Sequence, residues 1–216
     1  MSNSYPIPDD RSASAPGSAT RNKVPIANAL YPLLSSLPPA SKILEIASGT
    51  GEHIEYLASL YPTLQFFPTE ARIDMLDSLR RISERQPNVQ RPHELHVFDS
   101  THWANIEEEG PFDVVLAFNL IHIGHPTLTP LLLSHSARLA PGLVLYGAFK
   151  IDGRFMSEGD KKFDESLKSR DPEWGLREMR EIEGEARRVG FGAWEVAEMP
   201  AGNWVVVVTK GRGGGD

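Results

Sequence analysis

A short apolar run that leads directly into a pair of glycines limits the fold of this chain more than any other feature. Residues Lys42–Ala47 read KILEIA, and the turn after them carries Gly49 and Gly51. Apolar side chains then recur at helical spacing over Glu52–Leu60. This order predicts a strand, a tight turn and a helix, which is the unit that builds parallel α/β sheets.

The same alternation of strands and helices continues along the chain. Because repeated strand–helix units form parallel sheets with right-handed crossovers, we expect helices on both faces of one sheet. The predicted strands are Lys42–Ala47, Leu64–Pro68, Glu94–Phe98, Phe112–Phe118, Leu143–Phe149, Ala193–Glu198 and Trp204–Thr209. The predicted helices are Ile26–Leu37, Glu52–Leu60, Ile73–Ile82, Leu128–Leu139 and Leu176–Val189.

The last two predicted strands are too close in the sequence to be parallel. Only Met199–Asn203 joins them, whereas a parallel crossover needs about a dozen residues or more. A hairpin fits this connection, so we expect the last strand to be antiparallel. The sequence therefore predicts a Rossmann-like α/β fold, a doubly wound seven-stranded sheet with an antiparallel last strand. This arrangement differs from the all-parallel dinucleotide-binding fold.

Length and composition are those of one globular domain. The chain has 216 residues, of which 40% are hydrophobic and 24% charged. We expect residues 21–210 to form the domain, 1–20 a disordered arm rich in Ser, Pro and Ala, and 211–216 a flexible tail. Because no apolar run reaches the roughly 20 residues that cross a bilayer, and no secretory signal is present, we expect a soluble cytoplasmic protein without membrane contact.

Charge and residue types exclude several kinds of chemistry. The absence of cysteine excludes disulfides, thiolate metal sites and a cysteine nucleophile. A net charge of −7 repels polyanions, which disfavours bulk nucleic-acid binding and leaves open a short RNA or a modified nucleotide. His122, His125 and His135 do not reproduce the histidine pair with glutamate of zinc proteases, so we expect no metal site. The oligomeric state is not indicated.

An acid follows the second predicted strand at the spacing typical of nucleotide sites. Glu70 lies about 20 residues after Gly51, where an acid meets ribose hydroxyls in such sheets. A carboxylate there repels a ribose phosphate and favours an unphosphorylated adenosyl group. The dinucleotide fingerprint would require a third glycine where Ile54 stands, so dinucleotide binding is disfavoured. The alternative is that Gly49 and Gly51 only form a tight turn.

Asp99, at the end of the third predicted strand, allows two interpretations. Its carboxylate could face the adenine amino group, or it could cap a helix before Thr101. Trp103 likewise could cover the purine or belong to the core.

Together with further motifs, these residues resemble the methyltransferase-like protein twenty-six family, a class I methyltransferase group. The resemblance covers most of the chain, and the tryptophan-containing segment at 170–178 is its most specific mark. The matching segments are Arg21-Asn22-Lys23 with Pro25-Ile26, LEIASGTGEH at 44–53, PTE at 68–70, FNLIHI at 118–123, YGAF at 146–149, FD at 163–164, RDPEWGLRE at 170–178 and MPAGN at 199–203.

The resemblance implies an S-adenosylmethionine site around the glycine turn. It includes Glu45 of the motif itself, and the implied contact residues are Ala47, Gly49, Gly51, Glu70, Asp99 and Asn119. Asn22 and Lys23 would close over the carboxylate of the cofactor from a lid helix, or only begin that helix in solvent. Two departures stand out, because Ala47 replaces the first glycine of many methyltransferases and Val24 replaces an expected acid.

Two further residues are candidates for the chemistry. His122 follows the fourth predicted strand and could take a proton from the acceptor, or be a structural histidine. Arg177 could pair with a carboxylate substrate. In the alternative interpretation of that segment, Asp171 caps a helix beginning at Pro172 and Trp174 packs in the core.

The expected function is in-line methyl transfer from S-adenosylmethionine to a small-molecule acceptor. Such an enzyme aligns acceptor, methyl carbon and sulfur and excludes water. One alternative is an enzyme that retains the cofactor but catalyses cyclisation, elimination or rearrangement. Another is a non-catalytic adaptor that binds S-adenosylmethionine.

Overall fold

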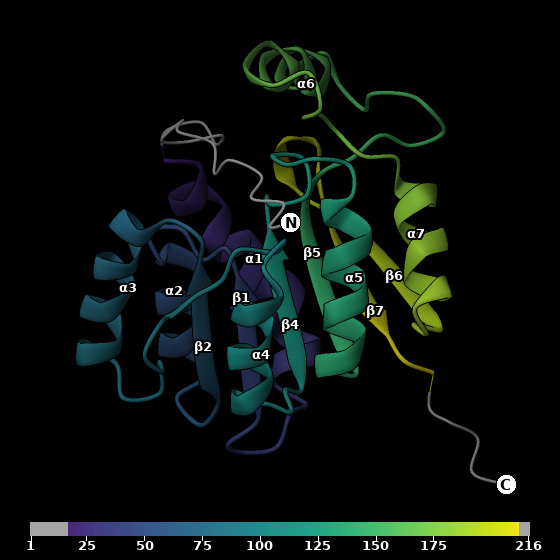
Figure 1. Ribbon diagram of the computed structural model, residues 1–216. Helices are drawn as coiled ribbons and strands as arrows, with labels where there is room; N and C mark the ends of the chain where they lie inside the picture. Colours follow the sequence, from purple (N-terminus) through teal and green to yellow (C-terminus); the bar gives the residue numbers. More distant parts are fainter. Residues whose placement is uncertain (1–16, 212–216) are drawn as a thin grey trace, which may run out of the picture.

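The computed structural model describes residues 17–211, which form one mixed seven-stranded sheet with helices around it (Figure 1). The strands lie in the order β3-β2-β1-β4-β5-β7-β6. Their bounds are β1 Lys42–Ile46, β2 Gln65–Glu70, β3 His93–Glu94, β4 Val114–Phe118, β5 Gly142–Ala148, β6 Ala193–Glu198 and β7 Asn203–Thr209.

The direction of each strand confirms the predicted topology. β1 pairs in parallel with β2 and β4, and the pairs β2–β3 and β4–β5 are also parallel. β7 is antiparallel to both β5 and β6, with Gly147 opposite Trp204 and Gly142 opposite Thr209. A single short 3-10 helix, η1 (Pro200–Gly202), connects β6 to β7. The short connection therefore forms the expected hairpin.

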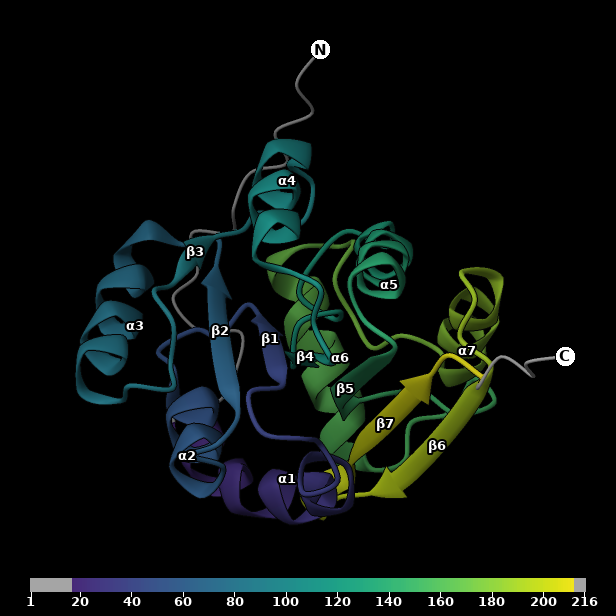
Figure 2. The ribbon, with the colours of Figure 1, turned by 90° about the horizontal axis from the view of Figure 1, so that it is seen from below.

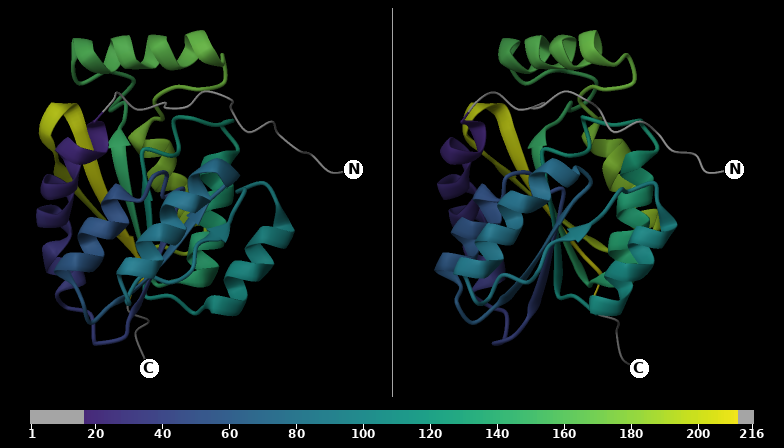
Figure 3. Two further views of the ribbon diagram at one scale, coloured as in Figure 1. Left: turned by 90° about the vertical axis from the view of Figure 1, so that its left-hand side faces the viewer. Right: turned by 60° about the vertical axis from the view of Figure 1, so that its left-hand side comes forward.

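Helices cover both faces of the sheet, and one helix lies across its edge. α1 (Ser18–Leu34), α2 (Glu52–Leu60) and α3 (Ile73–Arg85) cover one face, and α4 (Ser100–Glu109), α5 (Leu128–Leu139) and α7 (Met179–Arg188) cover the other (Figure 2). α6 (Glu158–Arg170) lies over the edge at which the parallel strands end (Figure 3). No helix within residues 17–211 is both long and apolar enough to span a bilayer.

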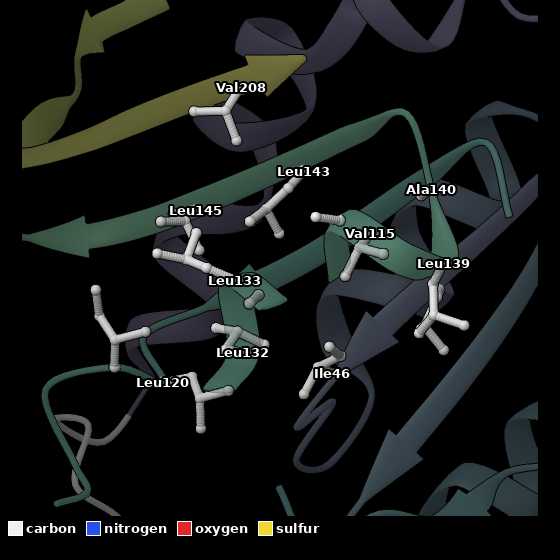
Figure 4. Packing of buried hydrophobic residues seen from close by; sticks show 14 of the residues in the cluster. Ile46, Val115, Leu120, Leu132, Leu133, Leu139, Ala140, Leu143, Leu145 and Val208 are labelled. Carbon is white, nitrogen blue, oxygen red and sulfur yellow. The ribbon is translucent and has the colours of Figure 1, made fainter. Parts of the chain in front are cut away.

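The core consists of two apolar layers on either side of the sheet. Every residue of β4 and β5 is buried, as expected for central strands covered on both faces. Val115, Leu143 and Leu145 of the sheet pack against Leu132 and Leu133 of α5 (Figure 4). This rigid centre fixes the strand ends from which the site is built.

Local structure differs from the expectations at several places. The third strand has only two residues in the ladder, because the segment 95–99 turns away from β2 toward α4. α6 was not predicted, since it buries only Asp160, Asp164 and Leu167 and so lacks an apolar period. α1 begins at Ser18, within the stretch 1–20 expected as an arm, and residues 1–16 lie outside the described part of the chain.

Candidate functional site

The glycine turn after β1 holds three residues in the left-handed region of backbone space. φ is +58° at Ala47, +57° at Gly49 and +90° at Gly51. A Cβ on Gly51 would lie 2.3 Å from Cδ1 of Ile82, so α3 leaves no room for a side chain there. A Cβ on Gly49 would meet nothing within 4 Å. The turn thus presents bare backbone to open space at Gly49, as close approach of a ligand requires.

Glu70, at the end of β2, closes this turn from the neighbouring strand. Its Oε2 accepts a hydrogen bond from the Gly49 amide at 2.8 Å. Its Oε1 accepts from the amides of Ala71 and Arg72 at 2.9 and 3.1 Å. The side chain is buried, and three backbone donors fix the carboxylate beside the glycine turn.

Glu45 places a second buried carboxyl next to the turn. The residue is 2% exposed, and its Oε2 has no hydrogen-bond partner among residues 17–211. Burial raises the pKa of Glu45 to about 8; the Ser48 hydrogen bond opposes this shift, and the nearby charge of Glu70 adds to it. A buried carboxyl oxygen without a partner is a position where a donor from a ligand would be favourable.

The first turns of α1 lie beside the start of α2. Thr20 Oγ1 donates a hydrogen bond to Glu52 at 2.6 Å, and Lys23 Nζ lies 5.4 Å from the centre of the Tyr56 ring. Asn22 and Lys23 are half-buried, and the charge of Lys23 acts on His53 in the first turn of α2. Val24 is exposed on α1.

His53 was missed by the sequence analysis, although it follows the glycine turn in the motif LEIASGTGEH. Its ring meets Phe118 edge-on, with centroids 5.2 Å apart and planes at 77°. Its Nε2 is buried without a hydrogen-bond partner in the described chain. Burial lowers the pKa of His53 to about 4; Glu52 acts against this shift and Lys23 in its favour. His53 thereby connects the glycine turn to the end of β4.

Asp99 is a helix cap. Its Oδ1 accepts from the amides of Thr101 at 2.8 Å and His102 at 3.3 Å, which satisfies the first turn of α4. These hydrogen bonds, of which the one from Thr101 has the larger effect, hold the pKa of Asp99 below its usual value. Trp103 is in the core, where it stacks on His135 and donates to Val97 O at 2.8 Å. The expectation that Trp103 covers a purine is therefore not supported.

Asn119 directly follows β4 at the same edge of the sheet. Its φ is +54°, and its amide donates to Tyr146 O at 2.7 Å. A Cβ on Gly147 of β5 would lie 3.6 Å from Asn119 Oδ1 and 3.3 Å from His122 Cε1. The absence of a side chain at Gly147 thus leaves room for both residues.

His122 lies under α6. It is 2% exposed, its Nδ1 has no hydrogen-bond partner within the described residues, and its ring meets Phe163 edge-on at 5.3 Å. Burial lowers the pKa of His122 to about 4, and the positive charge of Arg177 contributes to the shift. The ring is therefore neutral at pH 7.

Arg177 holds the loop around His122 through backbone carbonyls. Its Nε donates to Ile121 O at 3.0 Å, and its Nη2 donates to the carbonyls of Gly124 and Glu173. Burial lowers the pKa of Arg177. The negative charges of its acidic neighbours, of which Asp164 acts most strongly, oppose that shift. Pairing with a substrate carboxylate would have to use the remaining Nη1.

The segment before Arg177 differs from the sequence interpretation. α7 begins at Met179 and not at Pro172, because Asp171 ends α6 and its Oδ1 accepts from Glu173 N in a turn. Trp174 is buried in a small cluster with Leu167 and Leu176, as the core alternative expected. No group of three or more His, Asp or Glu in residues 17–211 is placed to hold a metal ion.

The predicted site residues therefore gather at one edge of the sheet. Glu45 lies near the end of β1, Ala47, Gly49 and Gly51 follow that strand, and Glu70 ends β2. Asn119 and His122 follow β4, with the start of α1 on one side and α6 above. This edge is where open α/β sheets bind their ligands. The strand order, the antiparallel last strand and this turn define the class I methyltransferase fold.

Within that class, the chain belongs to the family described as "Protein of unknown function (DUF938)", whose family model matches residues 13–210.

Solved methyltransferase structures share the fold at low sequence identity. An O-methyltransferase family protein from Burkholderia thailandensis is 17% identical, with a TM-score of 0.70 over 91% of this chain and 62% of that chain. A putative O-methyltransferase from Nostoc punctiforme is 17% identical, with a TM-score of 0.71 over 89% and 56%. Human N-acetylserotonin methyltransferase, in complex with SAM, is 14% identical, with a TM-score of 0.69 over 88% and 52%. This chain spans 52–62% of the length of these proteins.

Proposed function

We propose that this protein is an S-adenosylmethionine-dependent methyltransferase that acts on a small-molecule acceptor, and that it is a member of the methyltransferase-like protein twenty-six family. The observation that carries the proposal is the contact between Glu70 Oε2 and the Gly49 amide at 2.8 Å. A carboxylate beside a bare stretch of backbone at this turn supports a ribose site there, since open α/β sheets bind nucleotides at this edge.

The residues at this edge fit the cofactor. Glu70 would accept the ribose hydroxyls, and the open space at Gly49 would admit the nucleoside. The free Oε2 of Glu45 would accept from the ammonium group of the amino-acid tail, and Asn22 and Lys23 would face its carboxylate. Ala47 and Gly51 shape the turn. The second oxygen of Asp99 and the side chain of Asn119 remain proposed contacts to the adenine and the tail.

The chain's own residues would then assist the transfer. When bound, the cofactor supplies a sulfonium-activated methyl group that the acceptor atom takes by in-line displacement. An acceptor that carries a proton at that atom would release it to Nδ1 of His122, which burial keeps neutral but weakly basic. Because Phe163 covers this ring, the acceptor would enter with α6 displaced, and α6 would exclude water on its return. Arg177 would hold the loop through its carbonyl bonds, with Nη1 left for a substrate carboxylate.

A small acceptor agrees with the charge of the chain and with the name of one structural neighbour. The net charge of −7 disfavours polyanionic acceptors, and the human relative is named for N-acetylserotonin. The absence of any thiol leaves direct transfer to the acceptor, without a cysteine intermediate.

Calorimetry with S-adenosylhomocysteine tests the cofactor site. We expect Glu70→Gln to weaken binding by about 10- to 100-fold, because hydrogen bonds to a charged group are lost. The control is Glu94→Gln on the neighbouring strand, whose exposed side chain should leave affinity unchanged. Equal affinities of wild type and Glu70→Gln would refute the assigned site.

Incubation with isotope-labelled cofactor and a metabolite extract tests the reaction. A product heavier by one methylene unit, formed together with S-adenosylhomocysteine, supports methyl transfer. An isomerised or cyclised product without S-adenosylhomocysteine would show instead that the cofactor is retained for other chemistry. Tight binding with no product from any extract would favour the non-catalytic adaptor.

A further inference from the structure

The inward face of α6 contacts both His122 and the segment that follows α6. Phe163, Asp164 and Leu167 lie on this face at helical spacing, and Phe163 meets the His122 ring at 74°. Leu167 is completely buried in the cluster that contains Trp174 and Leu176. α6 is thus held over the edge where the parallel strands end by contacts with His122 and with residues 174–176.

Asp164 connects α6 to the segment that follows it through a hydrogen bond. It is 2% exposed, and its Oδ1 accepts from the Leu176 amide at 2.8 Å. Its Oδ2 accepts from Lys168 Nζ at 2.6 Å, and that lysine is half-exposed. Since a buried amide without an acceptor is unfavourable, Leu176 depends on Asp164 for its position.

Gly175 places the His122 backbone directly beside this bond. Its amide donates to His122 O at 3.0 Å. A Cβ on Gly175 would lie only 2.7 Å from Asp164 Oδ1, and φ at this residue is +144°. Only glycine allows the chain to pass between the Asp164 carboxylate and the His122 carbonyl at these distances.

Arg177 completes the connection on the far side of His122. Its donors bind the carbonyls of Ile121 and Gly124, on either side of the histidine along the chain. Segment 175–177 therefore holds the loop at three points, Ile121, His122 and Gly124, while Asp164 holds that segment to α6.

We propose that Asp164 is a positioning residue, which fixes the orientation of His122 through Gly175 and Leu176 so that α6 and the histidine keep one arrangement. This inference rests on the proposed function, in which His122 takes the acceptor proton. Loss of the Asp164 acceptor frees residues 175–177, and the His122 ring loses both its orientation and its seclusion from water.

The charges around His122 make the test selective. Arg177 acts on the histidine directly, and Asp164 on α6, Glu181 on α7 and Glu173 act on that guanidinium. Removing only the negative charge of Asp164 strengthens the influence of Arg177 and lowers the pKa of His122 further. Admitting water raises this pKa toward the ordinary value for histidine. Loss of the Asp164 charge and entry of water thus shift the pKa of His122 in opposite directions.

The experiment is an NMR titration of ring-labelled histidine in the full chain, with the His122 signal assigned from a His122→Asn variant. We expect Asp164→Ala to raise the His122 pKa by about one unit or more, because water reaches the ring. Asp164→Asn retains an acceptor for Leu176 and should leave the pKa unchanged or slightly lower. Glu165→Ala, an exposed substitution on the same helix, is the matched control.

An unchanged His122 pKa in Asp164→Ala, with Trp174 fluorescence showing that α6 has loosened, would overturn the positioning role. An equal rise of the His122 pKa in Asp164→Asn and Asp164→Ala would overturn it too, because Asp164→Asn keeps the acceptor for the Leu176 amide. Where turnover is detected, kcat should fall in Asp164→Ala while the affinity for S-adenosylhomocysteine is retained. A responsive His122 in a protein that never transfers a methyl group would count against the proposed function and leave the coupling intact.

Discussion

The ring of His53 at the start of α2 meets the ring of Phe118 at the end of β4, with centroids 5.2 Å apart. This contact joins the two halves of the site, because His53 follows the glycine turn and Phe118 precedes Asn119. The predictions below test the two halves separately.

The first prediction concerns stability in acid. Burial lowers the pKa of His53 and of His122 to about 4, so between about pH 6.5 and 4 the unfolded chain binds more protons than the folded chain. The free energy of unfolding should therefore fall as the pH drops through this window, by about 1.4 kcal/mol for each unit of pKa shift. Urea denaturation at several pH values measures the slope. His122→Asn should reduce it, and an unaltered slope in that variant would contradict a buried neutral ring.

Glu45 should show the opposite dependence. Burial raises its pKa to about 8, so between about pH 4.5 and 8 the folded chain binds the additional proton, and stability falls as the pH rises through this window. Glu45→Gln removes this loss, and its stability relative to wild type should improve from pH 5 to pH 8. If the relative stability of Glu45→Gln were flat over that range, the carboxyl would be ionised in the folded protein.

The two glycines of the turn should respond differently to alanine. Gly51→Ala places a Cβ 2.3 Å from Ile82 and should destabilise the protein by about 2–4 kcal/mol, as overpacking adds to backbone strain. Gly49→Ala meets no neighbour and should lower the free energy of unfolding by only about 1 kcal/mol. Relative to this loss of stability, it should weaken S-adenosylhomocysteine binding more than Gly51→Ala does. Thermal denaturation and calorimetry measure the two effects. Equal destabilisation by both substitutions would be inconsistent with the contact made by α3.

Ala47 stands in a conformation that glycine adopts more easily. At φ +58°, Ala47→Gly removes strain of about 1–2 kcal/mol but increases the entropy of the unfolded chain, for a net gain of up to about 1 kcal/mol. Ala40 has φ +66° and lies before β1, at the opposite end of the strand from the turn. Ala40→Gly should give a similar gain in melting temperature, and both variants should keep their affinity for S-adenosylhomocysteine. A fall in stability in Ala47→Gly alone would mean that its methyl group packs favourably.

The parts of the fold that depend on apolar patterns could be predicted from the sequence. α2 and α5 have the predicted bounds, since their buried residues recur at helical spacing. The antiparallel β7 followed from the length of one connection. α6 could not be predicted, because its buried residues are two aspartates and a leucine, and carboxylates do not mark a buried face in a sequence.

The same limit applies to the site. Glu70 could be placed from its spacing to Gly51, because strand ends meet at one edge of a parallel sheet. The partners of Arg177 could not, since all of them are backbone carbonyls, which leave no trace in residue identity. For His53, the sequence showed only its position in a motif, whereas its burial against Phe118 depends on the packing of α2 over β4.

The reversed direction of β7 has a practical consequence for how the protein can be handled. Because Thr209 lies opposite Gly142, the strand finishes at the edge of the sheet remote from the glycine turn, whereas Ser18 begins α1 close to that turn. Attachment to a sensor surface through a linker placed after Thr209 would leave the ligand-facing edge pointing into solution. A linker placed before Ser18 would instead lie beside the glycine turn, where it would hinder the binding of small molecules.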